Sequence, residues 1–110
     1  MADIKNNLIA AKNRLGILAK AAPDVFDAFS KLSKAATTDG AFNTAQKELM
    51  AVAIAVTQGC EDCILYHVDT AKRAGADEAA LVEALGVAVE MGGGPAVMYA
   101  GKALEAFHAL

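Results

Sequence analysis

Apolar residues along most of the chain recur every three or four positions, which is the spacing of one face of an α-helix. In residues 3–22, isoleucine, leucine and alanine recur at this interval with lysine and arginine between them. The pattern returns after Pro23 and again between Leu81 and Val89. No segment shows a sustained two-residue alternation bounded by hairpin turns. The chain is therefore predicted to be all-α.

Signals for helix ends divide this pattern into about six helices. Pro23 suits the first turn of one helix and Pro95 opens another. Asn43 and Gln46 fit the reciprocal capping pattern of a helix start, and Asp77 can cap a further helix. The expected helices cover residues 3–22, 23 to about 37, 43 to about 57, 60–73, 77 to about 91, and 95 onward. Short connections between several of them favour antiparallel packing in one bundle.

The length and composition predict one small, alanine-rich core. A chain of 110 residues has the usual size of one domain, so we expect residues 1–110 to form a single domain. Hydrophobic residues make up 55% of the chain, but aromatic residues only 5%. A chain this short buries only about two-thirds of its unfolded surface, so some apolar helix faces should be covered by other subunits. We therefore expect a homo-oligomer, such as a trimer or a hexamer.

Charge and hydropathy exclude two classes of partner. The net charge is −3 and no basic cluster is present, which argues against binding to nucleic acids or to anionic membranes. The longest apolar run, residues 49–56, is far shorter than the roughly 18 residues of a membrane span. The first residues do not form a secretory signal, so a cytoplasmic location is expected. In such a reducing compartment, two closely spaced cysteines indicate redox catalysis or a metal site.

Cys60, Cys63 and His67 form the strongest candidate site. If a helix begins at Cys60, the three side chains project from one face of it. A helix N-terminus and a nearby imidazolium both lower the pKa of a thiol from its usual value of about 8.5. Two thiols at this spacing can also form a disulfide with each other, so one can resolve a sulfenic acid or a mixed disulfide on the other. His67, one turn beyond Cys63, is placed to accept its proton.

Glu48 is the candidate partner of His67. It directly precedes the apolar run of residues 49–56, where a buried carboxylate would need a compensating group. A tight turn at Gln58 and Gly59 could fold the helix that follows back along this one and bring Glu48 beside His67. We expect Glu48 to hold the imidazole in the useful tautomer.

Other interpretations of these residues remain open. The cysteines could serve only in packing, or two cysteines, a histidine and a carboxylate could bind zinc. The chain lacks a second cysteine or histidine pair, so the interpretation without a bound metal is favoured. Glu61 and Asp62 place two negative charges beside the thiols, which raises the thiol pKa unless their side chains point outward. Acidic residues are in any case favoured at a helix N-terminus.

Together these residues resemble a known signature. Glu48, the segment Cys60-Glu61-Asp62-Cys63 and His67 are similar to the motif of the carboxymuconolactone decarboxylase superfamily, in its alkylhydroperoxidase D-like branch. The resemblance covers residues 42–104, because the turn at residues 74–78 and the helix after it also resemble that family.

The resemblance implies an oligomeric all-α fold and a thiol-dependent oxidoreductase that needs no cofactor. Its cysteine pair would reduce hydroperoxides or exchange disulfides, and a thiol-reductant protein or a lipoyl donor would restore the thiols. By the motif, Glu48, Cys60, Cys63 and His67 are the catalytic residues. The nearness of Cys63 to His67 favours Cys63 as the attacking thiol and Cys60 as the resolving thiol, and the roles exchange if Cys60 is the exposed thiol. In the family's peroxidase branch a histidine commonly precedes the second cysteine, where this chain has Asp62. The alternative is a non-redox protein of the same fold, either a lactone decarboxylase or a zinc-binding or ligand-binding protein.

Overall fold

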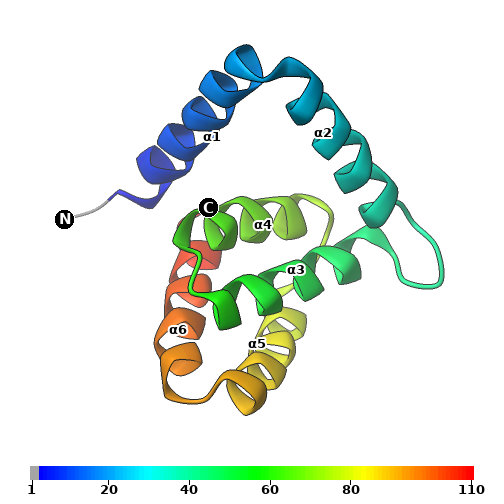
Figure 1. Cartoon of the computed structure of the whole chain (residues 1–110). Coiled ribbons are helices and arrows are strands. Elements are labelled where there is room, and N and C mark those ends of the chain that lie inside the picture. The colour runs from blue at the N-terminus through cyan, green and yellow to red at the C-terminus, as the bar shows by residue number, and fades with distance from the viewer. Residues whose placement is uncertain (1–2) are drawn as a thin grey trace.

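The computed structural model describes residues 3–110, and those residues form helices without any strand. The helices are α1 (Ile4–Ala21), α2 (Pro23–Thr37), α3 (Thr44–Gln58), α4 (Glu61–Arg73), α5 (Glu78–Gly92) and α6 (Gly94–Ala109). The predicted all-α fold is confirmed, and the helix bounds differ from the expected ones by at most one residue (Figure 1). Cys60, expected as the first residue of the fourth helix, is instead the N-cap of α4.

Side-chain caps begin the helices where the sequence predicts them. The capping box at α3 is present in both directions, with Asn43 accepting from the Gln46 backbone and Gln46 accepting from that of Asn43. The Asp77 carboxylate accepts a hydrogen bond from the backbone N–H of Ala80 at 2.8 Å. Each cap satisfies a backbone donor that the helix itself leaves unpaired.

The core lies among α3, α4, α5 and α6. Its largest fully buried side chains are Ile64, Leu81, Val52, Val56 and Val68. Buried alanines fill the positions between them, at Ala55, Ala71, Ala88, Ala96, Ala103 and Ala106. Such small side chains let the helix backbones approach closely, so a chain with few aromatic residues still reaches a dense core.

Helices α1 and α2, which we call the N-terminal arm (residues 3–37), lie outside this core. Figure 1 shows them as the two legs of an inverted V above the other four helices. α1 buries only Leu8 and Ala11, and α2 buries no residue at all. α1 and α2 diverge from the short connection at Ala22. The antiparallel packing predicted for helices joined by short connections is therefore wrong for this pair.

Polar contacts attach both ends of the arm. On α1, Lys12 and Arg14 form ion pairs with Asp69 and Asp62 of α4, at 3.5 and 2.8 Å. At the end of α2, the Thr44 hydroxyl donates to the carbonyl oxygen of Thr37 at 2.7 Å. Apart from the buried Leu8 and Ala11 of α1, the arm is therefore attached by polar contacts that are individually weak.

No helix within residues 3–110 combines the length and apolar character needed to cross a membrane. Several apolar side chains of the arm and of α5 and α6 are exposed, among them Val25, Phe29, Leu32, Met91 and Met98. The homo-oligomer expected from the composition stays a prediction.

The glycines between α5 and α6 generate a prediction about stability. A Cβ atom added at Gly92 would lie 2.7 Å from Ala96 Cβ and 3.3 Å from Thr57 Cγ2. We expect Gly92→Ala to lower the free energy of unfolding by about 1–3 kcal/mol, because neither neighbour has a flexible end that can move aside. Urea unfolding followed by circular dichroism measures this change. Gly94→Ala is the matched control, since nothing lies within 4 Å of its added Cβ; equal effects of the two substitutions would contradict the close contact at Gly92.

A candidate redox site between α3, α4 and the arm

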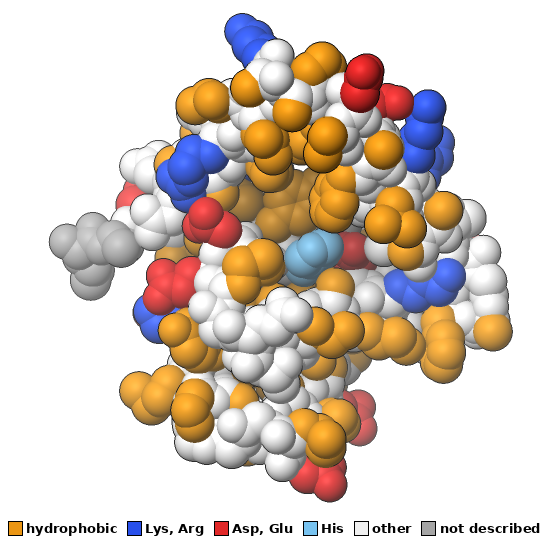
Figure 2. Space-filling view, viewed as in Figure 1, with side chains coloured by type: hydrophobic (Ala, Val, Ile, Leu, Met, Phe, Trp, Pro, Cys, Tyr) orange, Lys and Arg blue, Asp and Glu red, His pale blue; other side chains and the backbone are white. Residues whose placement is uncertain are grey.

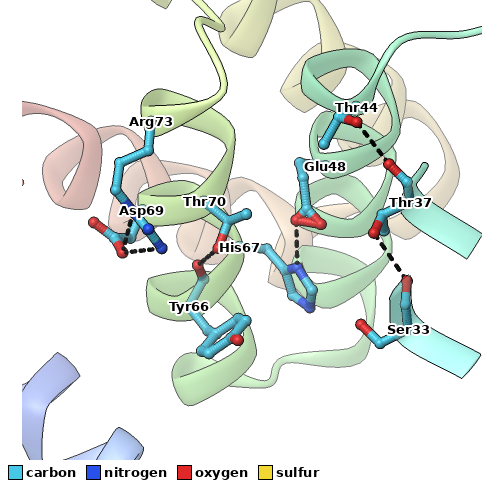
Figure 3. A network of polar contacts seen from close by, with 9 residues as sticks. All are labelled: Ser33, Thr37, Thr44, Glu48, Tyr66, His67, Asp69, Thr70 and Arg73. Carbon is cyan, nitrogen blue, oxygen red and sulfur yellow. Dashed lines mark hydrogen bonds and ion pairs between the residues drawn. The ribbon is translucent and has the colours of Figure 1, made fainter. Parts of the chain in front are cut away.

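Glu48 of α3 and His67 of α4 form a hydrogen-bonded pair inside the helix contact. Glu48 Oε2 lies 3.0 Å from His67 Nδ1, and Figure 3 shows the two side chains pointing toward each other from adjacent helices. Glu48 is 3% exposed and is the one buried polar residue among residues 3–110. A carboxylate oxygen accepts hydrogen bonds, so this contact places a hydrogen on Nδ1 and leaves Nε2 available to accept a proton. The pairing expected from the sequence is present.

The turn after α3 makes this pairing possible. Gly59 adopts the left-handed conformation with φ of 68°, and the Cys60 N–H donates to the Ala55 carbonyl at 3.1 Å. This helix end reverses the chain, so that α4 returns along α3. The Tyr99 ring covers the turn, because a Cβ added at Gly59 would lie 3.2 Å from it. Tyr99 therefore supports the turn.

Cys60 and Cys63 are joined in a disulfide, with their Cα atoms 5.3 Å apart. Cys60 Sγ also accepts a hydrogen bond from the Cys63 backbone N–H at 3.3 Å, as an N-cap group does. Both residues are partly exposed. The expectation that the two thiols can form a disulfide with each other is therefore met by the geometry, and a role in packing alone does not explain the pair.

The side chains that the zinc alternative would use are bonded to one another in this structure. Within residues 3–110, no group of three or more histidine, cysteine, aspartate or glutamate side chains is arranged to hold a metal ion. Glu48 is hydrogen-bonded to His67 and the two sulfurs are bonded to each other. His108 of α6, which the sequence did not connect with the site, pairs with Glu78 of α5.

Each of the two acidic residues between the cysteines has a basic partner. Asp62 pairs with Arg14 of α1, and Glu61 pairs with Lys102 of α6, both at 2.8 Å. The hydrogen bond and the charge of Glu61 raise the pKa of Lys102. Both acidic side chains are exposed, and their charges beside the thiols are offset by these basic partners. No local signal identifies Arg14 or Lys102, because they lie far from the motif in sequence.

A cavity of about 490 Å³ opens between the arm and α4. From α4 it is lined by Asp62, Cys63, Tyr66 and His67, whereas Cys60 and Glu48 do not line it. The arm contributes a wall that sequence reasoning missed, formed by Ala11, Arg14, Leu15, Leu18, Phe26, Phe29, Ser30, Ser33 and Lys34. Figure 2 shows this hollow, with hydrophobic side chains around it and a histidine at its edge.

The Arg14–Asp62 pair generates a prediction about the Cys63 thiol in the reduced protein. Arg14→Gln leaves the Asp62 carboxylate uncompensated beside Cys63, so the thiol pKa should rise. Asp62→Asn should lower it, and the double variant should return close to the starting value. The pH dependence of iodoacetamide alkylation, measured in a Cys60→Ser background, reports this pKa.

Lys12→Gln is the matched control for this prediction. It also removes an ion pair between α1 and α4, but its partner is Asp69, which does not adjoin the cysteines. A thiol pKa that moves equally in Lys12→Gln and Arg14→Gln would show that attachment of the arm matters and that the local charge does not.

Comparison with known proteins identifies the family of this chain. The family model described as carboxymuconolactone decarboxylase family matches residues 23–106. An uncharacterised protein of Cupriavidus necator is 47% identical over 108 residues, which are 98% of this chain and 96% of that protein. An uncharacterised protein of the cox locus of Paracoccus denitrificans is 42% identical over 104 residues, covering 94% of this chain and 92% of its own.

Two solved structures have the same fold. A carboxymuconolactone decarboxylase family protein of Legionella pneumophila superposes with a TM-score of 0.91 and 42% identity, over 96% of this chain and 94% of that one. A family protein of Thermotoga maritima, for which involvement in an antioxidative response has been suggested, has a TM-score of 0.80 and 25% identity, over 92% and 86% of the two chains. The family model matches most of the chain and these relatives cover nearly all of it, so the chain belongs to the carboxymuconolactone decarboxylase family.

Proposed function

We propose that the protein is a thiol-dependent oxidoreductase that uses Cys60 and Cys63 to reduce a hydroperoxide or to exchange a disulfide. One observation carries the proposal: Cys63 and His67 line one cavity, with Cys60 within disulfide distance behind them. A small substrate in this cavity would meet a thiol and a base together, and the second thiol is already placed to resolve the product.

In the proposed first step, the Cys63 thiol gives its proton to His67 Nε2, while Glu48 holds Nδ1–H. The thiolate attacks the terminal oxygen of a hydroperoxide and breaks the O–O bond. Cys63 becomes a sulfenic acid, and the alkoxide leaves as an alcohol with the proton from His67. Cys63 is assigned the attack because it lines the cavity and Cys60 does not.

In the second step, the Cys60 thiol attacks the Cys63 sulfur, a disulfide forms, and water leaves. The overall reaction converts two thiols and a hydroperoxide into a disulfide, an alcohol and water. With a disulfide substrate, attack by Cys63 releases one thiol and forms a mixed disulfide. Cys60 then displaces the second thiol.

A new cycle requires a dithiol reductant that returns two electrons and two protons to the Cys60–Cys63 disulfide. We propose a thiol-reductant protein or a lipoyl donor for this role, in the cytoplasm, where such reductants are kept reduced. The suggested antioxidative role of the relative from Thermotoga maritima supports this direction of electron flow.

The roles of the two cysteines can be tested with single variants. After reduction, Cys60→Ser should still form a sulfenic acid with hydroperoxide, because the attacking thiol remains, whereas Cys63→Ser should form none. Stopped-flow kinetics with a sulfenic acid trap measures both, and the wild type should lose two thiols for each hydroperoxide consumed. Sulfenic acid formation that survives only in Cys63→Ser would reverse the assignment. A reduced protein that binds one zinc ion and keeps its thiols in hydroperoxide would overturn the proposed function.

The Glu48–His67 pair is expected to act through proton transfer. His67→Asn should slow oxidation of the thiol by about a hundredfold at neutral pH, since the base is lost. The defect should shrink as the pH rises above the thiol pKa, because the thiolate then forms without a base. Glu48→Gln, which removes only the positioning charge, should cause a smaller defect with the same pH dependence.

Glu83→Gln serves as the control, because Glu83 is exposed on α5. A pH-independent loss in His67→Asn would indicate a purely structural role for the pair. Circular dichroism of each variant shows whether its helix content is intact.

A further inference from the structure

The apolar wall of the cavity is formed by side chains that the protein core does not use. Leu15, Leu18, Phe26 and Phe29 line it from the arm. Phe29 of α2 is 61% exposed and Leu18 of α1 is 49% exposed. α2 buries no residue, so its apolar side chains do not pack in the core. Covering exposed apolar area of this kind with an apolar molecule is favourable, because it removes that area from water. A volume of about 490 Å³ is within the range of sites for small organic molecules.

The charges around the cavity favour an anionic ligand. Arg14 and Lys34 are basic, and Asp62 is the one acidic residue that lines the cavity. Asp62 already pairs with Arg14. Within the described residues 3–110, no ion pair includes the Lys34 amine. The neighbouring Lys31 pairs with Asp27 at 3.1 Å. Lys34 therefore supplies a cation that a ligand's carboxylate can neutralise.

The reacting groups belong to another helix that lines the same cavity. Cys63 and His67 lie on α4, whereas Lys34 lies on α2. An occupant that contacts all three residues would have a reactive end at α4, an apolar body against the arm and an anionic end at Lys34. The Ser30 and Ser33 hydroxyls, which also line the cavity, can hydrogen-bond to such an anionic end.

We infer that the cavity binds an anionic amphiphile, an apolar chain with a terminal carboxylate, and presents its other end to Cys63. The identity of that reacting end, hydroperoxide or disulfide, rests on the proposed function. Recognition of the chain and the carboxylate does not depend on it, so the two can be tested separately.

Binding is measured first, with decanoate as the probe and without any redox reaction. Isothermal titration calorimetry should show decanoate binding to the wild type, and decyltrimethylammonium, which has the same chain but a positive charge, binding at least about tenfold more weakly. Lys34→Gln should weaken decanoate binding by about tenfold, and Lys31→Gln should leave it unchanged. Equal binding of the two amphiphiles, or no binding of decanoate, would overturn the inference.

Phe29 and Val25 provide a second matched pair of variants. Both are exposed on α2, at 61% and 68%, but only Phe29 lines the cavity. Phe29→Ser should weaken decanoate binding several-fold, and Val25→Ser should not. Neither substitution removes a buried side chain, so both proteins should fold. Equal losses would show non-specific adsorption and would contradict a built site.

A second copy of the chain is the competing occupant of the cavity. Light scattering of the same variants tests it: if Phe29→Ser dissociates an oligomer that Val25→Ser leaves intact, and decanoate does not bind, the cavity is a subunit contact and the inference is wrong.

Turnover then separates the inference from the proposed function. A fatty-acid hydroperoxide should have a KM about tenfold lower than tert-butyl hydroperoxide, and Lys34→Gln should raise that KM without changing kcat. Decanoate binding without any thiol oxidation would remove the proposed function but leave the ligand class standing. Oxidation of the thiols by small hydroperoxides without decanoate binding would do the opposite.

Discussion

The buried carboxylate of Glu48 is the constraint on which the arrangement of the site depends. A carboxylate removed from water costs several kcal/mol unless a partner compensates it. Here the partner is His67 Nδ1, at 3.0 Å, on the next helix. Because the two groups belong to α3 and α4, their contact sets the register of these helices. It also sets the orientation of the imidazole with respect to Cys63, one turn earlier on α4.

The two cysteines are chemically alike but stand in different surroundings. Cys60 caps α4 and does not line the cavity, whereas Cys63 lies inside the helix and does. A resolving thiol needs only to reach its partner, but an attacking thiol must meet a substrate and a base. The difference in position thus gives a structural reason for unequal roles. The acidic residues between them, Glu61 and Asp62, are exposed and pair with Lys102 and Arg14.

The division between core and arm explains how a small protein has room for a cavity of this size. Alanines in α3 to α6 allow close helix packing, so four helices are enough for the core. The arm therefore does not have to pack closely on α4. It is attached by ion pairs to α4 and by a hydrogen bond at the start of α3. Its apolar side chains, such as Leu18 and Phe29, become a cavity wall.

The sequence by itself determined the elements and the reactive groups of this protein. Helical periodicity, the caps at Asn43 and Asp77 and the glycine at position 59 are local signals, since each acts within a few residues of the chain. The Cys60, Cys63 and His67 spacing is also local, and the burial of Glu48 followed from the apolar run beside it. Tertiary structure alone decided which surfaces meet. The Arg14–Asp62 pair joins residues 48 positions apart. Part of the cavity wall comes from α2, whose sequence pattern resembles that of a packed helix. Contacts of this kind depend on how whole helices are placed relative to one another, and no local pattern encodes that placement.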